Sequence, residues 1–218
     1  MEIYPSLISS DLLNLAATLS LLDKHCDGYH LDVMDDHFVP NLTWGPAFIN
    51  AIAQQASRPL NVHLMVDNPE HWVRRLTLSH KDSFIFHWEA FHDVEPVTAL
   101  ASSIRSNGIQ AGLALNPKTN VENIKKILTH FDQILIMSVE PGFSGQPFIP
   151  EVLSKVTAFA QYKKEQSLSF EIAMDGGINE TNINLISSLG VTQCCIASGI
   201  FEHKNHIEAI ENLYKKCG

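Results

Sequence analysis

Residues 29–41 read YHLDVMDDHFVPN, and their alternation predicts a β-strand that is buried on both faces. Because strand side chains point alternately to opposite sides, Leu31 and Val33 share one face, and His30 and Asp32 share the other, next to a methionine. The first face is aliphatic, whereas the second pairs an imidazole with a carboxylate. Burying these polar groups requires a partner for them, and packing alone does not supply one.

The composition predicts one sizeable core and no polyanionic partner. The chain has 218 residues, 45% of them hydrophobic, and single α/β barrels commonly have about this length. The formal net charge is −9, from 15 basic and 24 acidic side chains, and the sequence has no basic run. We therefore expect neither a nucleic-acid surface nor an anionic-membrane surface. An anionic ligand would have to be bound by local groups.

The cysteines predict neither a disulfide framework nor a metal site. Cys26, Cys194, Cys195 and Cys217 lack the spacing of either, and the adjacent pair lies in an apolar run typical of core side chains. Free thiols are typical of a reducing compartment. The first residues show no signal-peptide pattern, and no apolar run is long enough to span a bilayer. We expect a cytoplasmic protein.

Short apolar runs alternate with longer amphipathic segments along the chain. Strands are predicted at residues 3–8, 28–34, 60–65, 83–87, 110–115, 133–139, 170–174 and 193–197. Helices are predicted at residues 11–25, 46–55, 69–79, 94–107, 121–129, 150–165, 180–189 and 203–216. Eight βα units without a break in composition favour a single (β/α)8 TIM barrel over residues 1–218, with a doubly wound open sheet as the alternative.

Three predicted strands end in polar residues that a barrel would bring together. His30 and Asp32 end the second strand, His63 the third and Asp175 the seventh. The carboxyl ends of barrel strands form one cup, where this fold places its active site. Each residue alone has an ordinary explanation, as a hydrogen-bonded core histidine or a turn-capping aspartate. Together, two imidazoles and two carboxylates would be costly to bury without a cation or a partner.

The four side chains form a nitrogen and oxygen donor set for one divalent metal ion. Zn, Fe(II), Mn and Co all accept such ligands, and the sequence does not choose among them. Three methionines also fall near strand ends, where they either fill the core or line the site: Met34, Met65 and Met137. His87 and Glu89 end the fourth strand and are candidates for a position behind the site.

Glycines cluster in the three loops that follow the sixth, seventh and eighth predicted strands. The clusters are GFSGQ at residues 142–146, DGG at 175–177 and ASG at 197–199. Glycine lets the backbone approach a ligand closely, and successive N–H groups bind phosphate without a basic side chain. TIM barrels usually hold phosphate in the loops after strands seven and eight. Glycines that only turn the chain are the alternative.

Several motifs resemble the ribulose-phosphate 3-epimerase family over nearly the whole chain. They are PSLISSD at residues 5–11, HLDVMD at 30–35, HFVPN at 37–41, HLM at 63–65, VEPGF at 139–143, GQ at 145–146 and DGGI at 175–178. Their order and spacing match the family. The resemblance implies a metal-dependent sugar-phosphate epimerase on a TIM barrel, and a homo-oligomer.

The resemblance also implies a role for each site residue. His30, Asp32, His63 and Asp175 match the family's metal ligands, and the two aspartates match its acid/base pair. Substrate contacts are expected from Ser6, Met34, His63, Met65, Met137, Gly142, Gly145, Gly176, Gly177, Ala197 and Ser198.

Epimerisation at carbon 3 of a 2-ketose removes the proton next to the carbonyl and returns a proton to the opposite face. The resemblance implies that Asp32 and Asp175 lie on opposite sides of a flat enediolate, whose charge a metal would stabilise. No redox cofactor is needed. D-Ribulose 5-phosphate is the expected substrate, and the allulose-6-phosphate 3-epimerase branch of the family offers a six-carbon alternative.

Three positions depart from the family pattern. Asp36 and Ala197 stand where glycine is usual, and Ser144 stands where many members have glycine. If position 36 needs a positive φ, aspartate tolerates it better than most residues, but with some strain. A catalytically inert sugar-phosphate sensor would not need all four polar side chains. An orotidine-type decarboxylase would need a lysine, which residues 30–36 lack.

Overall fold

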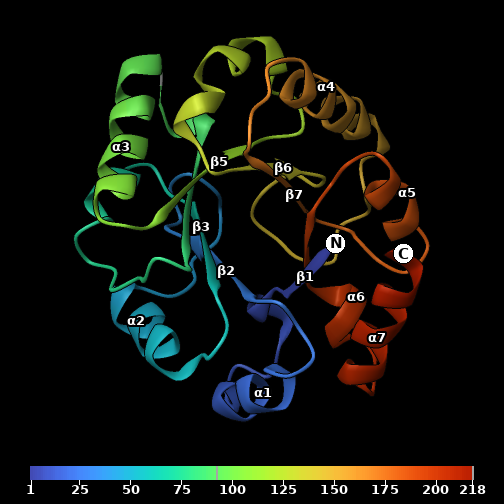
Figure 1. Cartoon of the computed structure of the whole chain (residues 1–218). Coiled ribbons are helices and arrows are strands. Elements are labelled where there is room, and N and C mark those ends of the chain that lie inside the picture. Colours follow the sequence, from blue (N-terminus) through green and yellow to red (C-terminus); the bar gives the residue numbers. More distant parts are fainter. Residues whose placement is uncertain (92, 218) are drawn as a thin grey trace.

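Eight parallel strands form a ring with the helices outside it in the computed structural model, which describes residues 1–91 and 93–217 (Figure 1). The strands are β1 (Glu2–Pro5), β2 (Tyr29–Met34), β3 (Leu60–Met65), β4 (Ser83–His87), β5 (Gln110–Leu115), β6 (Gln133–Met137), β7 (Glu171–Asp175) and β8 (Gln193–Ile196). The α-helices are α1 (Leu15–Leu22), α2 (Pro46–Gln55), α3 (Val94–Ser106), α4 (Leu153–Glu165), α5 (Ile183–Ser188), α6 (Ser198–Phe201) and α7 (His206–Cys217). This arrangement confirms the TIM barrel and excludes the doubly wound alternative. No helix in the described ranges is long and apolar enough to cross a membrane.

The ring closes beside the predicted site. Every sequential pair of strands from β2 to β8 is hydrogen-bonded in parallel, and β8 pairs with β1. Between β1 and β2, the contact is an isolated parallel bridge from Ser6 to His30. The Ser6 hydroxyl also donates a 2.6 Å hydrogen bond to Asp32. Residues of the predicted site therefore also join the two ends of the sheet.

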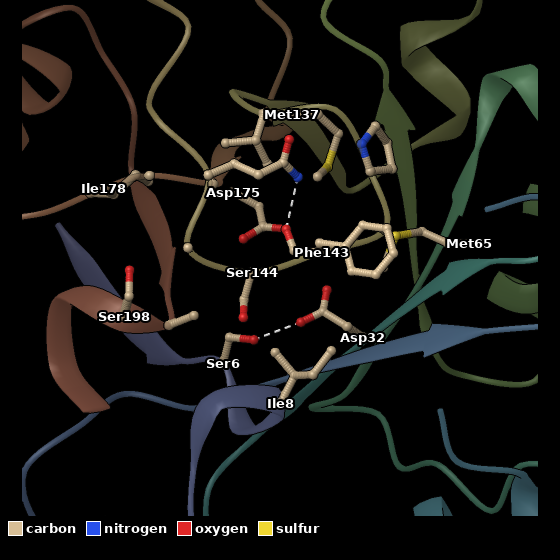
Figure 2. Close-up of a pocket in the computed structure, with 18 of the residues that line it drawn as sticks. Ser6, Ile8, Asp32, Met65, Met137, Phe143, Ser144, Asp175, Ile178 and Ser198 are labelled. Carbon is tan, nitrogen blue, oxygen red and sulfur yellow. Dashed lines mark hydrogen bonds between the residues drawn. The ribbon is translucent and has the colours of Figure 1, made fainter. Parts of the chain in front are cut away.

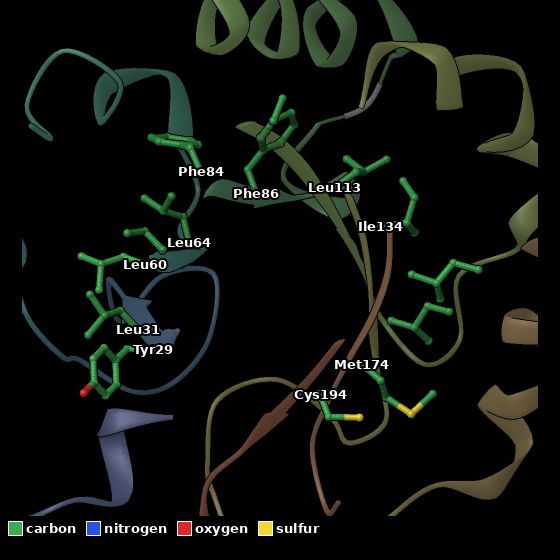
Figure 3. Packing of buried hydrophobic residues seen from close by; sticks show 14 of the residues in the cluster. Tyr29, Leu31, Leu60, Leu64, Phe84, Phe86, Leu113, Ile134, Met174 and Cys194 are labelled. Carbon is green, nitrogen blue, oxygen red and sulfur yellow. The ribbon is translucent and has the colours of Figure 1, made fainter. Parts of the chain in front are cut away.

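Strand alternation divides the core into two layers. Outward side chains such as Leu31, Leu64 and Phe84 belong to the large cluster packed between strands and helices (Figure 3). A smaller cluster fills the barrel interior with Tyr4, Ile85, Ala114, Leu135, Met137, Val139, Ala173 and Cys195. Cys194 and Cys195 are both buried as predicted, one in each layer.

Several predicted helices are shorter than expected because side chains bind the backbone at their ends. Residues 69–79 contain only a 3-10 helix at Pro69–His71, after which Asn50 binds both the carbonyl of Arg75 and the N–H of Thr77. Such contacts compete with helical hydrogen bonds. Residues 121–129 likewise form 3-10 helices, Val121–Asn123 and Lys125–His130, in place of one α-helix.

The helices predicted at residues 11–25 and 180–189 begin later than expected. The Asp11 carboxylate accepts a hydrogen bond from the N–H of Leu13, and α1 starts only at Leu15. The Asn179 side chain accepts from the N–H of Thr181, and α5 starts at Ile183. In both cases, a local turn takes the place of the first helical turn.

Among residues 1–91 and 93–217, two residues other than glycine have left-handed backbone. Asp36 has a φ of 60° and Ser167 a φ of 53°. Position 36 therefore does require a positive φ, and its aspartate carries the strain that the sequence suggested.

Replacing Ser167 with glycine is expected to raise the free energy of unfolding by about 0.5–1 kcal/mol, because glycine adopts positive φ without steric cost. Urea denaturation measures the change. Ser169→Gly is the control: Ser169 is exposed nearby without a positive φ, so glycine there should lower stability. Equal losses in both variants would contradict the assigned backbone strain.

Candidate active site

The carboxyl ends of the strands surround a pocket. Figure 2 shows Ser6, Asp32 and Asp175 projecting toward this pocket. Of the predicted substrate contacts, these residues line it: Ser6, Met34, Met65, Met137, Gly142, Gly145, Gly176, Gly177, Ala197 and Ser198. His63, the remaining one, is fully buried and does not line the pocket.

Two imidazoles and two carboxylates converge at the base of this pocket. His30 Nε2 and His63 Nδ1 each lie 3.2 Å from Asp32 Oδ1 and 3.8 Å from Asp175 Oδ2. One donor atom from each of the four residues lies within 4.8 Å of the other three. The structure thus brings together the four side chains predicted at the ends of three strands, and the cluster could hold a metal ion.

Burial and neighbouring charges separate the proton affinities of the two carboxyl groups. Burial raises the pKa of Asp32, but His30 and His63 outweigh this effect and hold it well below its usual range. Burial and the charge of Asp32 together raise the pKa of Asp175 to about 7. Near neutral pH, one carboxyl group is therefore an ionised base while the other can carry a proton, an arrangement typical of acid/base sites.

The pKa values of the two imidazoles are also shifted in opposite directions. Burial lowers the pKa of His63 to about 3, although the neighbouring Asp32 acts in the opposite direction. His63 is therefore neutral, the form that binds metals. Burial also lowers the pKa of His30, but Cys195 and Asp32 outweigh it and raise that pKa above its usual value.

The glycine loops after β6 and β7 pack closely against each other. Gly142, Gly145, Gly176 and Gly177 all have positive φ, between 63° and 125°. A Cβ at Gly177 would lie 2.7 Å from the backbone nitrogen of Phe148. Only glycine fits this contact without moving one loop from the other.

The departures at Ala197 and Ser144 cause no backbone strain. Ala197 has a φ of −97° and directly precedes α6, so its position does not require glycine. Ser144 is absent from the positions with positive φ. Both residues line the pocket, so their side chains affect the shape and polarity of the pocket. They do not change the backbone conformation.

Several pocket residues were missed by the sequence analysis. Ile8, Val139, Phe143, Gln146 and Ile178 also line the pocket. Each lies within or beside a motif that was recognised, but an apolar residue in a loop carries no signal of its direction.

One loop connection was also missed, because its partners are 101 positions apart in the sequence. The Asn41 side chain donates a 2.7 Å hydrogen bond to the carbonyl of Gly142 and so joins the loop after β2 to the loop after β6.

His87 and Glu89 lie behind the polar cluster, as predicted. His87 Nε2 is 2.8 Å from His63 Nε2, and His87 Nδ1 is 3.1 Å from Glu89. Burial raises the pKa of Glu89, but His87, Thr119 and Asn116 outweigh burial and lower it. Glu89 is therefore an ionised carboxylate at neutral pH.

A sequence profile described as the ribulose-phosphate 3 epimerase family matches residues 2–201. The chain belongs to this family. It is 38% identical over 216 residues to the ribulose-phosphate 3-epimerase of Mycobacterium bovis, covering 99% of this chain and 93% of that protein. It is also 38% identical over 213 residues to the ribulose-phosphate 3-epimerase of Helicobacter pylori strain J99, covering 98% and 96% of the two chains.

This member of the epimerase family also resembles solved structures of much lower sequence identity. The structure of KGPDC from Streptococcus mutans in complex with D-R5P has a TM-score of 0.72 at 13% identity, covering 99% of this chain and 96% of the other. At this identity the likeness shows the barrel fold alone.

Gly177→Ala is expected to weaken the binding of inorganic phosphate at least about tenfold, because the new methyl group separates the loops after β6 and β7. Isothermal titration calorimetry measures the dissociation constant. Gly108→Ala is the matched control, since Gly108 also has a positive φ but lies in open space away from the pocket. Unchanged phosphate binding by Gly177→Ala would remove this loop from the anion site.

Proposed function

We propose that this chain interconverts D-ribulose 5-phosphate and D-xylulose 5-phosphate by inverting carbon 3. The observation that carries the proposal is the pair Asp32 and Asp175, two nearly buried carboxyl groups that approach the same imidazole nitrogen of His30 beside one pocket. Membership of the ribulose-phosphate 3-epimerase family supports the assignment, as do the names of the curated relatives. The reaction is an isomerisation of a carbohydrate.

The two carboxyl groups supply the two proton transfers. Asp32 removes the proton from carbon 3 on one face of the substrate, and Asp175 returns a proton to the same carbon from the opposite face. The return reaction exchanges these roles. The hydroxyl of Ser6 holds Asp32 in position, and Ser138 holds the end of β7 by hydrogen bonds to the backbone carbonyl of Asp175.

The donor set fits one divalent metal ion held by His30, Asp32, His63 and Asp175. Its four donor atoms lie within 4.8 Å of one another, and the two carboxylates that repel each other there would both be stabilised by a cation. When bound, the ion would polarise the substrate oxygens at carbons 2 and 3 and lower the energy of negative charge on them. Zn, Fe(II), Mn and Co remain the candidates.

The rest of the pocket binds and shields the substrate. Backbone N–H groups of the glycine loops at Gly176, Gly177 and Ser198 bind the phosphate, which suits a chain with a net charge of −9. Met34 and Met65 line the pocket next to Asp32 and keep water from the deprotonated carbon. The names of the curated relatives favour the pentose phosphate over a six-carbon ketose phosphate.

We propose that residues 1–218 act as a single domain with one metal ion and one sugar-phosphate site. The homo-oligomer, the cytoplasmic location and the absence of nucleic-acid and membrane partners stay predictions.

Asp175→Asn is expected to lower epimerisation of D-ribulose 5-phosphate by about 10²–10⁴-fold, because the amide cannot donate or accept the proton at carbon 3. The measurement follows deuterium incorporation at carbon 3 in D₂O by NMR. Metal content and phosphate binding are measured on the same sample, because Asp175 is also a proposed ligand. Glu151→Gln, which removes an exposed carboxylate outside the pocket, is the control. Formation of D-xylulose 5-phosphate at the rate of the unmodified protein, with metal bound, would exclude the two-base role, whereas deuterium incorporation without inversion is the expected result of Asp32 acting alone on one face.

A further inference from the structure

A row of hydrogen bonds leads from His63 away from the pocket. His63 Nδ1 faces Asp32, while its Nε2 lies 2.8 Å from Nε2 of His87. The centres of the two rings are 4.9 Å apart, much farther than their facing nitrogens, so the rings meet through their edges. Both histidines are fully buried, and His87 Nδ1 lies 3.1 Å from Glu89 Oε2. The contacts therefore form one continuous row from β3 to the end of β4.

Glu89 is firmly held at the outer end of this row. Its second oxygen, Oε1, accepts a 2.9 Å hydrogen bond from the backbone N–H of Asn116 and another from the hydroxyl of Thr119. Lys155 on α4 in turn donates to the Asn116 carbonyl at 2.7 Å. The loop after β5 thus holds the carboxylate, and Lys155 in turn holds that loop.

These contacts determine where the hydrogens lie. A carboxylate only accepts hydrogen bonds, so His87 Nδ1 carries the hydrogen between it and Glu89. In a neutral His87 ring, Nε2 is then an acceptor, and the hydrogen shared with His63 belongs to His63 Nε2. His63 Nδ1 is left with a free lone pair, and this nitrogen faces Asp32 and Asp175.

We propose that His87 and Glu89 are positioning residues that hold His63 in the tautomer able to bind a metal through Nδ1. In the opposite tautomer, Nδ1 would carry a hydrogen toward Asp32 and could not bind a cation. Carboxylate–histidine pairs behind a ligating histidine commonly change metal affinity by about 10–100-fold. This inference rests on the proposed function only in requiring that the four-residue cluster holds a divalent ion.

The other histidine of the cluster has no equivalent support. His30 Nδ1 is buried and has no hydrogen-bond partner among the described residues. The two imidazole ligands therefore differ: His63 is oriented through a row of two further side chains, whereas His30 is oriented by packing, by Asp32 and by the neighbouring Cys195. We expect affinity for the ion to depend on the row behind His63.

Three variants test the inference, with Zn²⁺ as the probe and a competing chromophoric chelator as the readout. Glu89→Gln keeps the shape but places an amide N–H against either His87 or the Asn116 N–H. His87→Leu removes the acceptor for His63. His87→Gln is the conservative control, because its amide can accept from His63 and donate to Glu89. We expect Zn²⁺ binding to weaken about 10–100-fold in the first two variants and less than about threefold in the control.

A second readout separates positioning from general structural support. Long-range ¹H–¹⁵N spectra of the Zn²⁺-loaded protein are expected to show hydrogen on His63 Nε2, and exchange of this hydrogen with solvent should accelerate in His87→Leu. If His87→Leu does not fold, Glu89→Gln decides the question. Zn²⁺ affinity unchanged in Glu89→Gln, or His63 bound to the ion through Nε2, overturns the inference. An unmodified protein that binds no Zn²⁺ would instead contradict both the inference and the metal site of the proposed function.

Discussion

Two carboxyl groups held together out of water are the constraint on which the rest of this structure depends. Asp32 and Asp175 approach the same pair of imidazole nitrogens, and neither side chain has more than a small exposed area. Removing such charges from water is unfavourable unless they are paired and hydrogen-bonded. Imidazoles on two strands and the Ser6 hydroxyl supply part of that pairing. A divalent cation would supply the remainder, and the proposed proton transfers at carbon 3 would use the same two carboxyl groups.

The barrel provides the rigidity that this cluster needs. The polar side chains lie near the carboxyl ends of three strands: His30 and Asp32 on β2, His63 on β3 and Asp175 on β7. The backbone hydrogen bonds of the sheet therefore set their positions. The bridge between Ser6 and His30 joins the sheet ends at the site itself. The loops that follow the strands can then vary without moving the polar cluster. Glycines in the loops after β6 and β7 allow the backbone to approach an anion.

The strands and the four polar residues could be predicted because both depend on local pattern. Alternation identified β2 and β3, and a barrel necessarily brings strand ends to one mouth. The helix expected at residues 69–79 was wrong because a distant side chain, Asn50, binds its backbone. No local pattern reveals such a contact.

The same limit applies inside the site. His87 and Glu89 could be placed behind the cluster from the sequence, but the direction of their hydrogen bonds depends on Asn116 and Thr119 from another loop. The link between Asn41 and Gly142 is equally remote in sequence. The identities of the metal and the substrate concern groups outside the chain, so they stay predictions.

The most direct test of the account is parallel turnover of D-ribulose 5-phosphate and D-allulose 6-phosphate by the metal-reconstituted protein, with a chelator-treated sample alongside. The account predicts epimerisation of the pentose phosphate at least about tenfold more efficient than that of the hexose phosphate, and its loss on chelation. Preference for the hexose phosphate would contradict the substrate assignment while keeping the site. No turnover of either sugar with metal bound would contradict the assignment of Asp32 and Asp175 as a catalytic pair and would favour a sugar-phosphate sensor.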